Sequence, residues 1–334
     1  MNLYNVNRLI QIQDYIKLFS RNNKRSKNWA KVYKKYLKAP SLSPPLPVVL
    51  QIIPTELCNL RCKMCNQWGD NGYFLENKRP VSHMPIEKLT AFLDSFKRQN
   101  PNYLLSIHGG EPFCYKDMSA LLDYIYENKI DTFFSTNGTL INKFATQLAK
   151  INKHTFYLLS IDGGAETNDY IRGKGITDKI IKSIKELEES CIKQKSGLPK
   201  LIVNYCVNEY NLEDIDNITS VAKEAGALTI NYNLRWFLPE EKGVEYNKII
   251  ENEFKVTPTN TWTGWKTESK FEKISEAIDK IYSKKNKLFP PYYTVMPRDL
   301  TSKQAKLFYT DYNEIFDLKS CIMPSYMVRI HSSG

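Results

Sequence analysis

Short apolar runs and longer amphipathic stretches alternate along the chain between residues 48 and 236. The apolar runs are rich in β-branched and aromatic residues and have the length of buried strands. They predict strands at residues 48–53, 103–107, 132–135, 155–161, 201–207 and 229–236. The stretches between them carry apolar residues at helical spacing. They predict helices at residues 86–96, 118–125, 141–150, 178–191 and 212–225.

Strands that alternate with helices are typical of βαβ units, which build a parallel sheet. Six such strands predict an α/β fold, a partial (β/α)6 TIM-like barrel. Right-handed crossovers place the carboxyl ends of all the strands on one face of the barrel. Side chains that follow the strands are therefore expected to meet there.

The regions on either side of the barrel have different patterns. Residues 1–38 predict one or two helices, broken near Asn22 and Asn23, and four prolines in residues 39–47 predict an extended linker. Beyond residue 236 the alternation weakens, and one further helix is expected at residues 270–285. The predicted domains are therefore an N-terminal helical extension with its linker (1–47), the barrel (48–236) and a C-terminal extension (237–334).

The chain of 334 residues has a net charge of +11, and much of the excess lies at its N-terminus. Ten Lys and Arg residues in the first 38 face one acid, Asp14. Such a segment could meet nucleic acid or an anionic membrane surface, but a solvated amphipathic helix is favoured. Its expected buried side carries Leu9, Ile10, Ile12, Tyr15, Ile16 and Phe19.

Two further features bear on where the protein works. The sequence shows no apolar run long enough to cross a membrane and no secretory pattern at its start. Three of the seven cysteines are clustered, which suits a reducing compartment better than a disulfide framework. We therefore expect a cytoplasmic protein.

The clustered cysteines are Cys58, Cys62 and Cys65, which directly follow the first predicted strand. Thiolates at this C-x3-C-x2-C spacing can bind an iron–sulfur cube and leave its fourth iron open to another ligand. A structural zinc site that uses His83 as the fourth ligand is a second interpretation. A disulfide between two of the three is a third.

Unusual polar groups follow the next three strands as well. The second strand leads into Gly109, Gly110 and Glu111, where the glycines allow a close backbone approach and the carboxylate can accept bonds from an ammonium group. Asn137 follows the third strand and Ser160 ends the fourth. Arg172 comes soon after and could clamp a carboxylate. These groups together would suit the amine and carboxylate of an amino acid, although each alone is also ordinary turn or surface chemistry.

The sequence resembles the radical S-adenosylmethionine (radical SAM) superfamily over residues 48–236. The resemblance rests on the cysteine spacing, the Gly-Gly-Glu-Pro element at residues 109–112 and the polar strand ends. The resemblance implies a [4Fe-4S] cluster on Cys58, Cys62 and Cys65, with SAM on the fourth iron. An external flavodoxin- or ferredoxin-like reductant would supply one electron. SAM would then be cleaved to a 5′-deoxyadenosyl radical, which would abstract a hydrogen from the substrate.

By the same resemblance, particular side chains would contact SAM. Glu111 would take its amine, with Gly109 and Gly110 beside it, and Asn137, Ser160 and Arg172 would handle its ribose and carboxylate. The substrate would be a peptide, a protein or a small metabolite. A non-catalytic iron–sulfur or zinc protein and an RNA-modifying radical SAM enzyme remain alternatives, although no RNA-binding module is evident.

The C-terminal residues resemble the opening of a SPASM-type auxiliary-cluster domain. Cys321, an apolar stretch at residues 327–331 and Gly334 match that opening. The remaining cysteines of such a domain would lie after residue 334, so we expect a truncated domain. Cys114, Cys191 and Cys206 are interpreted as ordinary, partly buried thiols.

Overall fold

Eight parallel strands form one open sheet in the computed structural model of the chain, which describes residues 3–39, 43–76, 80–265, 272–284, 293–296, 301–311 and 322–333. The strand order is β7-β6-β5-β4-β3-β2-β1-β8, and every neighbouring pair is parallel. The strands are β1 (Val49–Ile52), β2 (Leu104–Ile107), β3 (Thr132–Thr136), β4 (Thr155–Ser160), β5 (Leu201–Val207), β6 (Thr229–Leu234), β7 (Tyr293–Met296) and β8 (Met327–Ile330).

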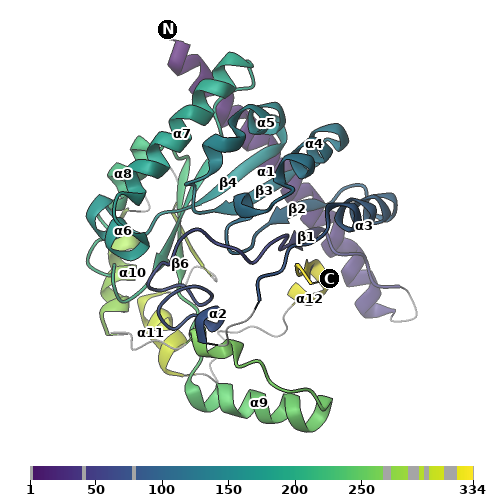
Figure 1. Cartoon of the computed structure of the whole chain (residues 1–334), viewed down its shortest axis with the longest axis vertical. Coiled ribbons are helices and arrows are strands. Elements are labelled where there is room, and N and C mark those ends of the chain that lie inside the picture. Colours follow the sequence, from purple (N-terminus) through teal and green to yellow (C-terminus); the bar gives the residue numbers. More distant parts are fainter. Residues whose placement is uncertain are drawn as a thin grey trace.

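Helices connect and cover the strands, as Figure 1 shows. They are α1 (Leu3–Lys38), α2 (Tyr73–Glu76), α3 (Ile86–Gln99), α4 (Met118–Asn128), α5 (Ala145–Ile151), α6 (Ala165–Arg172), α7 (Ile176–Lys193), α8 (Ile218–Glu224), α9 (Glu240–Phe254), α10 (Glu272–Lys284), α11 (Ser302–Thr310) and α12 (Met323–Tyr326). The predicted partial barrel of parallel strands is confirmed. The predicted count of six strands is too low, because β7 and β8 extend the sheet at its two edges.

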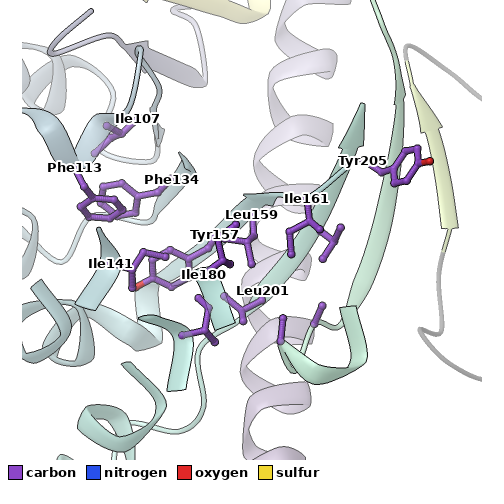
Figure 2. Packing of buried hydrophobic residues seen from close by; sticks show 14 of the residues in the cluster. Ile107, Phe113, Phe134, Ile141, Tyr157, Leu159, Ile161, Ile180, Leu201 and Tyr205 are labelled. Atoms are coloured by element: carbon purple, nitrogen blue, oxygen red, sulfur yellow. The ribbon is translucent and has the colours of Figure 1, made fainter. Parts of the chain in front are cut away.

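The core lies between the sheet and the helices that follow its strands. Aromatic rings are central to it: Phe134 on β3 stacks on Phe113 at 5.2 Å and on Tyr157 of β4 at 6.0 Å between ring centroids. Figure 2 shows these rings beside Leu159 and Ile180. Side chains from the first four strand units thus share one core, which holds the carboxyl ends of these strands in place for the site described below.

Helix α1 lies across the amino-terminal ends of the strands, behind the sheet in Figure 1. Arg8 donates to the carbonyl groups of Gly226 and Ala227, just before β6, at 2.6 and 3.1 Å. Arg21 and Arg25 bind Asp131, just before β3, at 2.9 and 3.1 Å. A helix of this length rises about 54 Å, enough to cross the whole floor of a barrel. The N-terminal extension is therefore built into the fold.

Two details predicted for this helix are wrong. It is continuous through Asn22 and Asn23. The reason is that Arg8, Arg21 and Arg25, spread along one side of the helix, bind groups that precede β6 and β3. The side expected to be buried is also mostly exposed: Ile16 and Phe19 are 59% and 54% exposed, whereas Gln11 and Leu18 are 1% exposed. The strand ends present backbone carbonyl groups and Asp131, so polar side chains of α1 turn inward to meet them.

The C-terminal part also differs from expectation. Residues 240–254, for which no element was predicted, form α9, whose side chains are mostly solvent-exposed. No helix in the described part of the chain is long and apolar enough to cross a membrane. The strand β8 pairs with β1 in parallel register, Val49 opposite Met327, so the end of the described chain lies beside the strand that leads into the cysteines.

Lys200 lies fully buried at the floor of the sheet and donates to the carbonyl oxygen of Asn152. Burial lowers its pKa to about 8 from an ordinary 10.5, although Asp14 opposes the shift. The folded state therefore binds fewer protons than the unfolded state between these values, so this group makes stability rise with pH from 8 to 10.5.

Lys200→Met is expected to stabilise the protein by about 1–2 kcal/mol at pH 7, because the cost of burying the charge outweighs the hydrogen bond lost by Asn152. The gain should shrink as pH rises from 8 to 10.5. Urea unfolding of both proteins across this range measures it. A variant less stable than the wild type at pH 7 would contradict the prediction.

Candidate active site

The loop that carries the three clustered cysteines follows β1 and is held by its own backbone. Cys65 N donates to Cys62 O at 2.9 Å, and Gly69 N donates to Cys65 O at the same distance. Lys63 N donates to Ile171 O of α6, also at 2.9 Å. The loop is therefore fixed against the element that follows β4.

Backbone amides also point at two of the thiols. Leu60 N donates to Cys58 Sγ and Trp68 N donates to Cys65 Sγ, each at 3.4 Å. Burial raises the pKa of Cys58 to about 12 and that of Cys62 to about 11. Binding of a metal centre by Cys58 and Cys62 would therefore release protons.

Asn137, at the end of β3, joins the cysteine loop through its side chain. Its Nδ2 donates to Asn59 Oδ1 at 3.0 Å and lies 4.0 Å from Cys58 Sγ. Thr139 completes the group, because its hydroxyl donates to Asn137 Oδ1 at 2.7 Å and accepts from Asn59 Nδ2 at 2.9 Å. The predicted strand-end residue is thus brought to the first cysteine.

Arg172 lies at the second cysteine. Its Nη1 is 3.9 Å from Cys62 Sγ, and its Nη2 forms an ion pair of 2.6 Å with Asp162. Asp162 is fully buried and accepts from Cys206 N at 2.8 Å through its other oxygen. Burial raises the pKa of Asp162, while the nearby guanidinium of Arg172 opposes this. A guanidinium therefore lies against a metal-ligating candidate, held there by a buried carboxylate.

Glu111 is fully buried between β2 and β3. Its carboxylate accepts from Thr136 Oγ1 and from Asn137 N, each at 2.7 Å, and from Phe113 N at 3.2 Å. Burial raises the pKa of Glu111 to about 7, and these hydrogen bonds oppose the shift. In this structure the carboxylate joins two strand ends, one of which carries Asn137.

Gly109 and Gly110 bring the end of β2 against the segment that precedes the cysteines. Gly110 N donates to Thr55 O at 3.2 Å, and Glu111 N donates to Leu57 O at 2.8 Å. A Cβ at Gly110 would lie 2.2 Å from the carbonyl oxygen of Glu56. The close approach that the glycines allow is therefore to the chain's own backbone beside Cys58.

The sequence matches the family model for the radical SAM superfamily over residues 52–222, half of the chain. The chain belongs to the radical SAM superfamily. Membership implies SAM and a [4Fe-4S] cluster as cofactors. The matched region contains all three clustered cysteines and the four strand ends described above.

Relatives of known name match about half of the chain or somewhat more. The mycofactocin maturase MftC of Mycolicibacterium smegmatis is 27% identical over 182 residues, 54% of this chain and 43% of that protein. Fe-coproporphyrin III synthase of Methanosarcina barkeri is 31% identical over 171 residues, 51% of this chain and 39% of that one. This chain thus spans less than half the length of these two relatives.

The fold is similar to that of a solved structure, SuiB from Streptococcus suis bound to S-adenosylmethionine. The TM-score is 0.62 with 20% sequence identity, over 92% of this chain and 63% of SuiB. At this identity the match shows the shared fold alone. It covers more of the chain than the family model does.

The donor set fits the cluster that the radical SAM family implies. The three thiols influence one another's charge, two of them accept backbone N–H bonds, and a guanidinium lies beside one. Among the described residues no group of three or more His, Cys, Asp or Glu side chains is arranged around a single ion. The cysteines of a cube bind separate irons, so Cys58, Cys62 and Cys65 stay the predicted ligands of the cluster.

Other sequence predictions have mixed outcomes. Ser160 is half-buried at the end of β4, opposite Asn204 of β5, and its contact with SAM stays a prediction. The six described cysteines, Cys114, Cys191 and Cys206 among them, are free thiols, so no disulfide forms between them. Cys321 and Gly334 lie outside the described residues, and the SPASM-like opening stays a prediction.

Several site residues were missed by sequence reasoning. Asn59 lies inside the cysteine motif, and its polarity beside Cys58 was the available signal. Glu56 is fully buried, accepts from Ser82 at 2.9 Å and lies 3.2 Å from His331, just after β8. Nothing local connects positions so far apart in the chain, so this contact had no signal in the sequence.

Gly110→Ala is expected to lower stability by about 1–3 kcal/mol and to reduce iron incorporation, because a methyl group there collides with backbone beside Cys58. Urea unfolding and iron analysis after anaerobic reconstitution measure the two effects. Gly175→Ala is the control: its φ of +75° adds strain, but nothing lies within 4 Å of the added Cβ. Equal losses of stability and of iron in the two variants would contradict the explanation by collision.

Proposed function

We propose that this chain is a radical SAM enzyme that cleaves S-adenosylmethionine and uses the product radical to abstract hydrogen from a peptide or protein substrate. The observation that supports it most is the meeting of Asn137 and Arg172 with Cys58 and Cys62, at 4.0 and 3.9 Å. Polar groups from the end of β3 and the end of α6 thus lie beside two of the three candidate cluster ligands. The cluster, when bound, supplies one-electron reduction of the sulfonium.

The position of each site residue suggests its role in binding the cluster or SAM. Cys58, Cys62 and Cys65 would be the protein ligands of the cluster. Arg172, kept cationic beside Asp162, would lower the cost of negative charge on Cys62 and face the carboxylate of SAM. Asn137 offers an amide beside Cys58, and Glu111 fixes the backbone of Asn137.

The substrate class rests on the fold relative. SuiB, also solved bound to the precursor peptide SuiA, aligns with this chain at a TM-score of 0.60. The matched sequence relatives also include a probable GTP 3′,8-cyclase of Methanocaldococcus jannaschii, 28% identical over 213 residues. A small-molecule substrate is therefore the second candidate.

The activity is tested on the whole chain, reconstituted anaerobically with iron and sulfide. We expect 5′-deoxyadenosine to be released from SAM when dithionite is added, as measured by liquid chromatography. Deuterium transfer from a labelled peptide into 5′-deoxyadenosine would identify the substrate class, and transfer from a labelled nucleotide instead would favour the second candidate. A chain that holds the cluster and never cleaves SAM would refute the proposal.

A further inference from the structure

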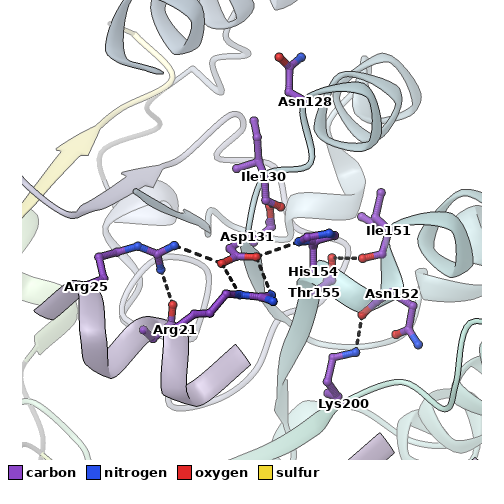
Figure 3. A network of polar contacts seen from close by, with 12 residues as sticks. Arg21, Arg25, Asn128, Ile130, Asp131, Ile151, Asn152, His154, Thr155 and Lys200 are labelled. Atoms are coloured by element: carbon purple, nitrogen blue, oxygen red, sulfur yellow. Dashed lines mark hydrogen bonds and ion pairs between the residues drawn. The ribbon is translucent and has the colours of Figure 1, made fainter. Parts of the chain in front are cut away.

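Helix α1 has an inner side, bound to the floor of the sheet, and an outer side that faces solvent. Arg21 and Arg25 reach from the inner side to Asp131, as Figure 3 shows. Further along the helix, the buried Trp29 packs edge-on against Tyr326 of α12, with 5.1 Å between ring centroids. Near the other end, one arginine binds the carbonyl groups before β6. These contacts fix which side chains of α1 point outward.

The first half of the outer side carries a row of exposed, large apolar side chains. Steps of three and four residues place its members along one stripe of the helix. This apolar row is Leu9, Ile12, Ile16 and Phe19, which are 51%, 38%, 59% and 54% exposed. Single exposed apolar residues are ordinary, whereas a contiguous group of them marks an interaction surface. The described part of the chain leaves this row open to solvent.

The second half of the outer side is cationic. The same steps of three and four residues continue from the apolar row through Asn23 to a row of exposed lysines. This lysine row is Lys27, Lys31, Lys34 and Lys38. The acid of this helix, Asp14, lies 3.7 Å from Lys17, and its side chain is only 17% exposed. The outer side of α1 therefore combines an apolar half with a positively charged half and carries no exposed carboxylate.

A membrane surface that contains anionic phospholipids matches both halves. An interfacial helix buries its apolar face about 5–10 Å into the boundary between headgroups and acyl chains. Lysines on the same helix attract anionic headgroups. A second copy of the chain matches less well, because a parallel pair of helices would bring the lysine rows together and an antiparallel pair would set each against an apolar row. Nucleic acid would bind the lysines and leave the apolar row uncovered.

We propose that the outer side of α1 docks on an anionic phospholipid surface. The apolar row would lie among the lipid chains and the lysine row among the headgroups. Helix α1 covers the amino-terminal ends of the strands, behind the sheet in Figure 1, whereas the cysteine loop follows a carboxyl end. Docking therefore leaves the candidate active site facing away from the membrane, where a substrate can reach it. This proposal does not depend on the proposed function.

The test measures co-sedimentation of the whole chain with two kinds of vesicle. One is phosphatidylcholine alone, and in the other half of the lipid is phosphatidylglycerol. We expect at least about tenfold tighter binding to the anionic vesicles, and this binding should weaken as salt is added.

Two variants of the outer side separate its halves. Ile16→Ser with Phe19→Ser removes two side chains of the apolar row and should weaken binding to anionic vesicles at least about tenfold. Lys27→Gln with Lys31→Gln and Lys34→Gln should also weaken it at least about tenfold and reduce its dependence on salt. All five positions are exposed, so urea unfolding should show folded proteins of near-normal stability.

Matched variants elsewhere on the surface are the controls. Tyr126→Ser with Ile192→Ser removes two exposed apolar side chains of α4 and α7. Lys179→Gln with Lys182→Gln and Lys193→Gln removes three exposed charges of α7. Both control variants should bind the anionic vesicles as the wild type does.

Several results would overturn the proposal. They are equal binding to both kinds of vesicle, no binding to either, wild-type binding by either variant of the outer side, and equal weakening in the control variants. Dimerisation without vesicle binding, lost in Ile16→Ser with Phe19→Ser, would assign the outer side to a second copy of the chain instead. Tighter binding to mixed-sequence RNA than to anionic vesicles would assign it to nucleic acid.

Discussion

Alanine in place of any one of Cys58, Cys62 and Cys65 is expected to abolish iron–sulfur assembly and the release of 5′-deoxyadenosine from SAM. Each thiolate would bind a different iron of the cube, so loss of one leaves a second iron without its protein ligand. Burial raises the pKa of Cys58 and Cys62, so each would have to lose a proton to bind iron. Two thiols would offset this cost with fewer metal bonds than three. Iron and sulfide analysis, with chromatography of the nucleoside, measures both losses.

Cys191→Ala is the matched control for these variants. Cys191 is a buried free thiol on α7, in the hydrophobic core, so its removal tests the loss of a thiol without the loss of a ligand. It should keep about four irons per chain and near-normal SAM cleavage. Full activity in all three ligand variants would contradict the assignment of the cluster.

Asp162→Asn is expected to cost about 3–5 kcal/mol of unfolding free energy, because it leaves the buried guanidinium of Arg172 without its carboxylate. An arginine cannot lose its proton to relieve this cost. An amide at position 162 would also turn either its NH₂ group or its single oxygen toward Arg172, and the oxygen is needed by Cys206 N. Urea unfolding of the apo-protein under reducing conditions measures the loss.

The reverse change, Arg172→Met, should cost less near neutral pH, because the buried Asp162 can take up a proton. Its pKa is already raised by burial and should rise further without the cation. A raised pKa in the folded state means that stability falls as pH rises above the ordinary value of about 3.8. The Arg172→Met variant should therefore show a steeper loss of stability with rising pH than the wild type.

The double variant Asp162→Asn with Arg172→Met completes the cycle. It removes both charges and should recover most of the stability lost in Asp162→Asn, because no unpaired charge remains. Recovery of stability without recovery of SAM cleavage would separate the structural role of the pair from its proposed contact with SAM. Additive losses in the double variant would show that the two side chains do not depend on each other.

Local patterns predicted the barrel well. Residues 201–207 were predicted as a strand and form β5 with the same bounds, and the helix predicted at 178–191 lies within α7. Side chains return to the same face about every two residues in a strand and about every 3.6 residues in a helix. Where one face is buried, a short run of apolar positions therefore distinguishes the two. By contrast α9 was missed, because most of its side chains face solvent and leave no clear apolar stripe to detect.

In the candidate site, too, features that depend on neighbours along the chain were predicted, and features that depend on packing were not. The spacing of Cys58, Cys62 and Cys65 and their place after the first strand were readable, because both depend only on neighbours along the chain. The pairing of Arg172 with Asp162 was not predicted, although Arg172 was noted after the fourth strand. Direction of a side chain depends on packing, and α6 turns Arg172 inward toward Cys62.

The amino-acid sequence alone thus predicted the alternation of parallel strands with helices in the barrel and the position of the three clustered cysteines after its first strand. Tertiary structure decided which face of α1 is buried, that β8 lies beside β1, and that Asn59 binds Asn137. The physical reason is distance along the chain. Periodicity reports burial within one element, whereas these contacts join residues far apart in sequence, whose partners exist only after the sheet has formed.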